Sequence, residues 1–221
     1  MSLELLQLDV SDDGSVTAAA SALAGKEPLY ALVNNAGVGP NDSEGDALLQ
    51  TNFYGPRRVS EAFVSMIAPG GRIANVSSGA ASMWLREQSA ETKALFTNPD
   101  ISWPELDAAV RAAAPAASMG GYGLSKAGLT TYTMIQAKMH PSLVCTSLSP
   151  GFIDTNMTRG WGASLTPEQG TVSLIKCLFG EVTSGWYYGS DGLRSPLTVT
   201  RDPGTPEYEG EPDPDASKYN N

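Results

Sequence analysis

The chain has 221 residues, 41% of them hydrophobic, which is enough for the core of one domain and excludes a wholly disordered protein. Its net charge of −10, from 14 basic and 24 acidic residues, opposes binding to nucleic acid. The apolar runs are too short to span a bilayer and no charged-then-apolar leader opens the chain, so we expect a cytoplasmic protein without membrane contact. The two cysteines lack the spacing of metal ligands and predict no metal site.

Strands and helices alternate in the first part of the chain. Short runs rich in Leu and Val predict buried strands, whereas alanine-rich stretches between a capping residue and a glycine predict helices. The helix cap is Ser11 or Asp12, and Gly25 is the stop signal. The expected strands are 5–10, 29–34 and 72–77, and the expected helices are 12–23 and about 47–67, the second ended by Pro69-Gly70-Gly71.

The second part of the chain continues this alternation. Helices are expected at 90–96, 104–113, 122–139 and 166–178, and strands at 143–149 and 186–188. Ser102 and Glu105 have the spacing of a capping box, and Thr166 begins another. Alternating strands and helices predict an α/β fold with a doubly wound, Rossmann-like parallel sheet. Ligands of such folds bind beyond the carboxyl ends of the strands.

Tyr122 and Lys126 stand four residues apart at the start of a predicted helix, so they share one face. A nearby ammonium favours the phenolate and lowers the pKa of a tyrosine, which makes the phenol a better acid or base near neutral pH. A serine hydroxyl across the site can hold a substrate oxygen while its charge changes. This spacing is common in helices by chance, so the pair alone is weak evidence.

Five motifs in order add to that evidence. They are Asn34-Asn35-Ala36-Gly37, Thr51-Asn52, Asn75-Val76-Ser77-Ser78, Tyr122-Gly123-Leu124-Ser125-Lys126 and Ser149-Pro150-Gly151. Together they resemble the short-chain dehydrogenase/reductase family over most of the chain. The long segment at 80–121 looks like the helical insertion of its carbonyl-reductase-like group. This resemblance implies an NAD(P)-dependent enzyme that reduces a ketone or aldehyde to an alcohol, or the reverse.

The resemblance also implies roles for single residues. Tyr122 corresponds to the general acid or base, Lys126 to the residue that lowers its pKa and binds the nicotinamide ribose, and Ser78, rather than Ser77, to the polarising hydroxyl. Asn52 corresponds to an asparagine that holds a water in the proton relay. The implied cofactor-binding residues, besides Tyr122 and Lys126, are Asp9 and Val10 beside the adenine, Asn35, Ala36 and Gly37 along the adenosine side, and Pro150, Gly151, Ile153 and Thr155 over the nicotinamide.

The relatives commonly prefer NADP, with NAD as the other possibility, and the insertion implies a monomer with a small carbonyl or alcohol substrate. The family usually opens with a strand, a glycine-rich turn and a helix, a unit that we do not find before the strand at 5–10, so we expect an N-terminally truncated Rossmann-like domain. A misplaced start, a short variant, or a rebuilt sheet that pairs 5–10 with 29–34 would each explain this. The alternative function is a cofactor-poor remnant that acts as a binding or regulatory subunit.

The last residues differ in composition from the rest of the chain. Between Asp202 and Asn221 there are six acidic residues and one lysine, with many Pro and Gly and few aliphatic residues. This composition predicts a flexible, solvated tail at 201–221 after a cofactor-binding domain at 1–200.

Overall fold

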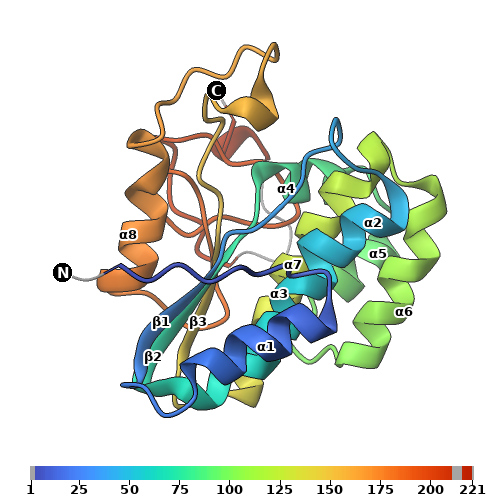
Figure 1. Cartoon of the computed structure of the whole chain (residues 1–221). Helices are drawn as coiled ribbons and strands as arrows, with labels where there is room; N and C mark the ends of the chain where they lie inside the picture. Colours follow the sequence, from blue (N-terminus) through green and yellow to red (C-terminus); the bar gives the residue numbers. More distant parts are fainter. Residues whose placement is uncertain (1–2, 211–215, 221) are drawn as a thin grey trace.

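The computed structural model describes residues 3–210 and 216–220, and its centre is a parallel sheet (Figure 1). The strands of the described residues are β1 (Leu29–Asn34), β2 (Ile67–Val76), β3 (Val144–Leu148) and β4 (Tyr187–Tyr188). They lie side by side in the order β1-β2-β3-β4, and each neighbouring pair is parallel. This arrangement confirms the predicted α/β class with a Rossmann-like parallel sheet.

Helices cover both faces of the sheet (Figure 1). On one face, α1 (Asp13–Leu23) and α3 (Gly55–Phe63) pack on each other and on Leu29 and Leu32 of β1. On the other, α8 (Val172–Phe179) brings Cys177 against Ala74 and Leu148. The expected cap and stop of α1 are confirmed, because Asp12 accepts a hydrogen bond from the Ser15 amide and Gly25 has φ = 78°.

The long helix α7 (Tyr122–Met139) forms the centre of the largest apolar cluster. Three helices of the predicted insertion pack around it: α4 (Gly79–Arg86), which the sequence did not predict, α5 (Ala90–Phe96) and α6 (Trp103–Ala113). The predicted capping box of Ser102 and Glu105 is present at the start of α6. Short 3-10 turns at Ala114–Ala116 and Met119–Gly121 then lead into α7.

The single helix expected from about 47 to 67 is three segments in the structure. They are α2 (Gly45–Leu49), a π-helical turn (Gln50–Tyr54) and α3, followed by a 3-10 turn (Val64–Met66). The helix ends before the Pro-Gly-Gly sequence, which lies inside β2 instead. Gly71 is required there, since an added Cβ would lie 2.7 Å from the carbonyl oxygen of Tyr30.

The predicted strand at 5–10 is wrong, because residues 3–9 form no helix or strand. Leu3 and Leu5 are 86% and 88% exposed, and β1 pairs with β2 and not with this segment. A strand needs a neighbouring strand to pair its backbone groups. The segment has none in the described part of the chain, so an apolar sequence was not sufficient to form a strand. The idea of a sheet rebuilt by pairing 5–10 with 29–34 is wrong for the same reason.

The C-terminal residues that the structure describes pack on the domain, unlike the expected solvated tail. The Arg201 guanidinium donates two hydrogen bonds to the Asp191 carboxylate, at 2.8 and 2.9 Å. Tyr219 is only 1% exposed and contacts the ring of Tyr208. The remaining 3-10 turns are Asn156–Thr158, Gln169–Thr171 and Ala216–Lys218. The acidic residues at 211, 213 and 215 lie outside the described residues.

No helix in the described ranges is long and apolar enough to cross a membrane. In the same ranges, His, Cys, Asp and Glu side chains form no group that could hold a metal ion.

Candidate active site

Two hydroxyl groups meet at the carboxyl edge of the sheet. Ser78 follows β2 and caps α4, where its Oγ accepts a hydrogen bond from the Ala80 amide at 3.2 Å. Tyr122 is the first residue of α7, and the left-handed Gly121 before it (φ = 89°) turns the chain into that helix. Burial raises the pKa of the Tyr122 phenol, and a hydrogen bond with the Ser78 side chain acts in the opposite direction. The structure therefore brings the two predicted hydroxyls together.

Lys126 lies one turn further along α7 and is only 5% exposed. Its Nζ donates a hydrogen bond to the Val76 carbonyl oxygen at 2.9 Å and lies 5.8 Å from the centre of the Tyr122 ring. Burial lowers the pKa of Lys126 to about 8. An ammonium has three donors. Val76 is its hydrogen-bond acceptor in the part of the chain that the structure describes, so it keeps capacity for oxygen atoms of a ligand.

The pKa of Tyr122 differs from the sequence-based expectation. Burial raises it, and the hydrogen bond with Ser78 offsets this only in part. The expected lowering by the Lys126 ammonium is not observed, since Lys126 is itself desolvated and hydrogen bonded to Val76. A phenol with a raised pKa is protonated at neutral pH, which suits it to give up a proton to a strong base.

The two neighbouring serines have different surroundings, which supports the choice of Ser78 over Ser77. The Ser77 side chain is buried between β2 and α7, where its hydroxyl donates to the Lys126 carbonyl at 3.0 Å and shares a hydrogen bond with Thr130 at 2.7 Å. These contacts fix α7 against the sheet and leave Ser77 no access to a substrate. Ser78 is the serine at the open end of the strand.

Asn52 lies inside the π-helical turn and is fully buried. Its side chain accepts a hydrogen bond from the Val38 amide and donates one to the Val38 carbonyl, both at 2.9 Å, and reaches Ser125 Oγ at 3.4 Å. Single π-helical turns inside α-helices are frequent at functional sites. Asn52 therefore anchors the loop after β1 to the base of the Tyr122 helix.

The loop Asn35-Ala36-Gly37 begins where β1 ends and leads to Val38. A Cβ on Gly37 would lie 3.2 Å from Asn52 Oδ1 and 3.5 Å from Lys126 Nζ. A glycine there keeps the backbone close to both polar groups. This loop, Asn52 and Lys126 thus form one group in the structure.

The segment after β3 lies on the other side of Ser78. Ser149 Oγ accepts hydrogen bonds from the Gly79 and Gly151 amides, both at 3.2 Å, and so joins the start of α4 to this segment. Beyond Pro150, Ile153 forms a bridge to Leu165, and Thr155 caps the turn at Asn156–Thr158. The four predicted residues of this segment therefore lie on one strap, which Ser149 joins to Gly79, the residue after Ser78.

Asp9 and Val10 occupy a separate position before α1. The Asp9 carboxylate accepts hydrogen bonds from the Ser11 amide and hydroxyl, at 2.9 and 2.6 Å, and these hydrogen bonds lower its pKa. The Val10 side chain packs against Gly55 at the start of α3, and its carbonyl accepts a hydrogen bond from Arg58. No contact joins this pair to Tyr122 or Lys126 among the described residues.

Two further residues, Ser149 and Tyr187, lie at this site without having been predicted from the sequence as site residues. Ser149 was named only as part of a motif. Its hydrogen bonds to the Gly79 and Gly151 amides, which join two loops, are seen only in the folded structure. Tyr187 of β4 is buried, and its pKa is raised by desolvation, lowered by a hydrogen bond with Ser149 and raised by proximity to Tyr122. Only the last strand of the sheet brings Tyr187 here, so no local signal could have identified it.

A nicotinamide dinucleotide fits one half of this site. The unsatisfied donors of the buried Lys126 ammonium and the close approach of Gly37 suit a ribose, next to the Ser78 and Tyr122 hydroxyls. In the described ranges, no glycine-rich turn joins a strand to a helix N-terminus, which is the element that usually holds a pyrophosphate. The residues present therefore fit the nicotinamide and its ribose.

Comparisons with known proteins agree with this geometry. The profile of the short chain dehydrogenase family matches residues 1–91. The (+)-neomenthol dehydrogenase of Arabidopsis thaliana is 29% identical over 217 residues, covering 79% of this chain and 72% of that protein. The carbonyl reductase [NADPH] 1 of Bos taurus is 29% identical over 194 residues, covering 76% of this chain and 69% of that protein.

Among solved structures, salutaridine reductase from Papaver somniferum has the same fold, with a TM-score of 0.69 at 23% identity over 82% of this chain and 80% of that one. The profile match and the two relatives agree with the ordered motifs. The first 91 residues match the short chain dehydrogenase family, and the chain as a whole is similar to a neomenthol dehydrogenase and to carbonyl reductases.

Proposed function

We propose that this protein catalyses the NADPH-dependent reduction of a ketone or aldehyde to an alcohol. The observation that carries the proposal is the meeting of the Ser78 and Tyr122 hydroxyls at the open edge of the sheet, with the buried Lys126 ammonium one turn below. The names of the relatives, a neomenthol dehydrogenase and a carbonyl reductase that uses NADPH, support this reaction and this cofactor.

In this proposal, bound NADPH supplies a hydride to the carbonyl carbon. The carbonyl oxygen gains negative charge as this happens, and Ser78 and Tyr122 donate hydrogen bonds to it. Tyr122 then gives its phenolic proton to the oxygen, which completes the alcohol. The raised pKa of Tyr122 keeps the proton on the phenol at neutral pH until a strongly basic alkoxide develops. This favours the reductive direction near pH 7.

Lys126 has two tasks in the proposal. Its ammonium stabilises the phenolate that Tyr122 becomes after proton transfer, and its remaining donors hold the nicotinamide ribose. Asn52 is a positioning residue, since its side chain is fully used by Val38 and Ser125. It keeps Gly37 close to Lys126 and so shapes the ribose position. The Pro150–Thr155 strap is assigned to the nicotinamide ring.

The proposal includes a monomeric state. Helices α4, α5 and α6 pack on α7 and cover the face of that helix. Most of α7 is buried as a result, including Leu124, Leu129 and Ile135. Analytical ultracentrifugation should therefore give the mass of one chain, and a stable dimer would contradict this part of the proposal.

A direct assay tests the reaction. We would follow NADPH absorbance with menthone, the ketone that corresponds to neomenthol, and with a set of aromatic aldehydes. Tyr122→Phe removes the proton donor and keeps the ring, so turnover should fall by about 100- to 10,000-fold. Tyr30→Phe is the matched control, because Tyr30 is 51% exposed and donates its hydroxyl hydrogen bond to Leu178 on the far side of the sheet. It should leave turnover unchanged.

The outcome that would overturn the proposal is equally clear. If Tyr122→Phe loses less than about tenfold while the wild type turns over, another group supplies the proton. If neither ketones nor aldehydes consume NADPH at any cofactor concentration, the carbonyl-reductase assignment itself fails for this chain.

A further inference from the structure

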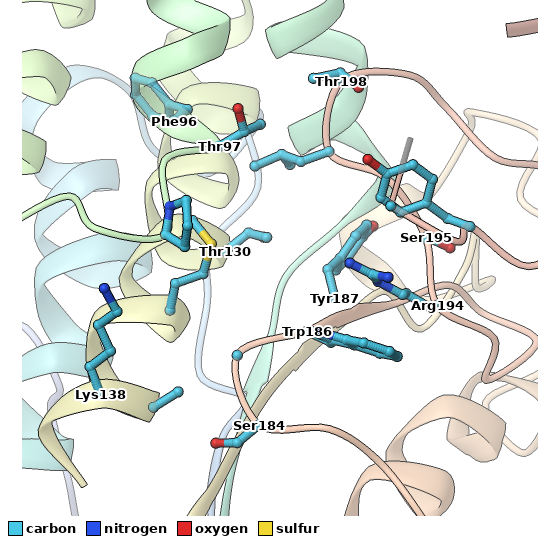
Figure 2. A pocket seen from close by; sticks show the side chains of 17 residues that line it. Phe96, Thr97, Thr130, Lys138, Ser184, Trp186, Tyr187, Arg194, Ser195 and Thr198 are labelled. Carbon is cyan, nitrogen blue, oxygen red and sulfur yellow. The ribbon is translucent and has the colours of Figure 1, made fainter. Parts of the chain in front are cut away.

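The structure contains a cavity of about 490 Å³ that shares the Tyr187 side chain with the candidate active site (Figure 2). It lies between the C-terminal half of α7, the residues that follow α5, and the segment from Ser184 to Thr198. Cavities of about 300–1,000 Å³ are the size that holds drug-sized ligands. None of the residues assigned above to catalysis or to the cofactor lines this cavity.

The body of the cavity is apolar and partly aromatic. Phe96, Met134, Trp186 and Leu197 contribute to its wall, and Figure 2 shows the Trp186 ring lying beneath the Arg194 side chain. Methionine and aromatic side chains adapt to irregular apolar ligands. The hydroxyls around them are mostly engaged: Thr97 donates to the Lys93 carbonyl. This wall suits an apolar body better than a sugar or another hydroxyl-rich group.

The charge of the cavity is opposite to that of the protein. Its lining residues include two basic ones, Lys138 and Arg194, and no acidic one, although the chain carries a net charge of −10. Figure 2 shows Lys138 on one side and Arg194 on the other. Lys138 forms an ion pair with Asp100. The positive charge that remains for a ligand is that of Arg194.

Among the described residues, the Arg194 guanidinium has no carboxylate partner, and the Glu207 carboxylate accepts its hydrogen bond from the Arg194 backbone amide instead. Its guanidinium lies 3.8 Å from the centre of the Trp186 ring and 5.0 Å from that of Tyr208. In the residues that the structure describes, it forms no ion pair and donates no side-chain hydrogen bond. Arg57, the other arginine stacked on a tryptophan, forms an ion pair with Glu61. A fixed guanidinium with free donors is built for bidentate binding of a carboxylate.

We propose that this cavity binds an apolar carboxylic acid in its ionised form. The carboxylate pairs with Arg194, and the apolar body lies along Trp186 and Met134 toward Phe96. A carboxylate brings the two acceptors that match the guanidinium fork, whereas an alcohol of the same length brings one weaker acceptor. An apolar carboxylic acid is therefore the class of ligand that matches the fixed Arg194 guanidinium and the apolar wall of the cavity.

Isothermal titration with decanoate and with decan-1-ol, both below the concentration at which they aggregate, tests the proposal. Wild-type protein should bind decanoate at least about tenfold more tightly than decanol, because a hydrogen bond to a charged group contributes that much or more. Arg194→Gln should remove this preference and leave decanol binding unchanged. Arg57→Gln, the matched control, should change neither affinity by more than about twofold.

Two further variants separate this cavity from other sites and protect the test from misfolding. Thr198→Phe places a ring in the cavity without changing charge, so it should weaken both ligands by about tenfold or more. Ser78→Ala, at the candidate active site, should leave decanoate binding unchanged. Circular dichroism shows whether each variant is folded. If Arg194→Gln does not fold, the proposal is tested by ligand binding to Thr198→Phe and by the ratio of the decanoate and decanol affinities of the wild type.

Three results with the wild type and Thr198→Phe would overturn the proposal. They are no binding of decanoate to the wild type, equal affinities for decanoate and decanol, and decanoate binding that survives Thr198→Phe. Loss of decanoate binding in Ser78→Ala would also overturn it, because the acid would then occupy the candidate active site. None of these results depends on the proposed reductase activity.

Discussion

The central strands of the sheet and the first strand predicted from the sequence behave differently. At β2 and β3, every strand has a neighbour, and the side chains after them form a dense polar group around Lys126 and Tyr122. At residues 3–9, an equally apolar sequence has no neighbouring strand and stays extended and exposed. Apolar composition therefore indicates which residues are able to form a strand, whereas the presence of a neighbouring strand decides whether they form one.

The first prediction compares the stability contributions of the two regions. Leu148 of β3 is fully buried, so Leu148→Ala should lower the free energy of unfolding by about 2–5 kcal/mol. Leu5 is 88% exposed, and Leu5→Ala should change it by less than about 0.5 kcal/mol. Urea denaturation of both variants checks this. A large loss from Leu5→Ala would show that the segment 3–9 is packed in solution.

The second prediction concerns the polar group at the end of β2. Ser78→Ala removes a hydrogen-bond donor to the developing oxyanion, which typically costs about 100- to 1,000-fold in kcat. Ser77→Ala should lower stability instead, because Ser77 bonds to the Lys126 carbonyl and to Thr130. Steady-state kinetics and thermal unfolding of both variants separate the two roles. Equal kinetic losses from both would contradict the assignment of Ser78.

The third prediction follows from the buried ammonium of Lys126. Its folded-state pKa of about 8 lies below its ordinary value of 10.5, so the unfolded chain binds more protons between these values and stability rises with pH there. Lys126→Met removes this dependence. The difference in unfolding free energy between variant and wild type should shrink by an amount on the order of 3 kcal/mol from pH 8 to pH 10.5.

Urea titrations of both proteins across this pH range make the measurement. Burial raises the pKa of Cys145 and Cys177, which lowers stability as pH rises, but both proteins share that effect and the difference cancels it. A difference that stays constant with pH would mean that the ammonium is hydrated rather than buried.

The fourth prediction has the smallest effect and tests the insertion. A Cβ on Gly123 would lie 2.7 Å from the Trp84 Cβ and 2.9 Å from the Ala80 carbonyl oxygen, where α4 crosses α7. Gly123→Ala should therefore lower stability by about 1–3 kcal/mol. Gly79→Ala is the control, since a Cβ there meets nothing within 4 Å. It should leave thermal unfolding unchanged or raise the melting temperature.

Much of the fold could be predicted where the signal is local. The bounds of β1, α5 and α7 match the predicted 29–34, 90–96 and 122–139, because caps, glycines and apolar runs mark their ends. The π-helical turn at Gln50–Tyr54 could not be predicted, since nothing in those residues distinguishes it from an α-helix. The lost strand at 5–10 depends on partners, which a sequence window does not contain.

The candidate site divides in the same way. The motifs predicted that Ser78, Tyr122 and Lys126 would converge, and they do so because each follows or faces the end of a parallel strand. Their electrostatics could not be predicted, since the burial that lowers the pKa of Lys126 and raises that of Tyr122 comes from the whole fold. Tyr187 reaches the site only through the position of β4 in the sheet.

The central claim is that the hydroxyls of Ser78 and Tyr122 form a site where a carbonyl carbon receives hydride from NADPH. Reduction of menthone with NADPH carrying deuterium at the transferred position tests it most directly, with mass and NMR spectra of the product. The account predicts one deuterium on the carbinol carbon, and about 100- to 10,000-fold less of this labelled alcohol from Tyr122→Phe over the same time. Alcohol without deuterium, or no alcohol at saturating NADPH, would contradict it.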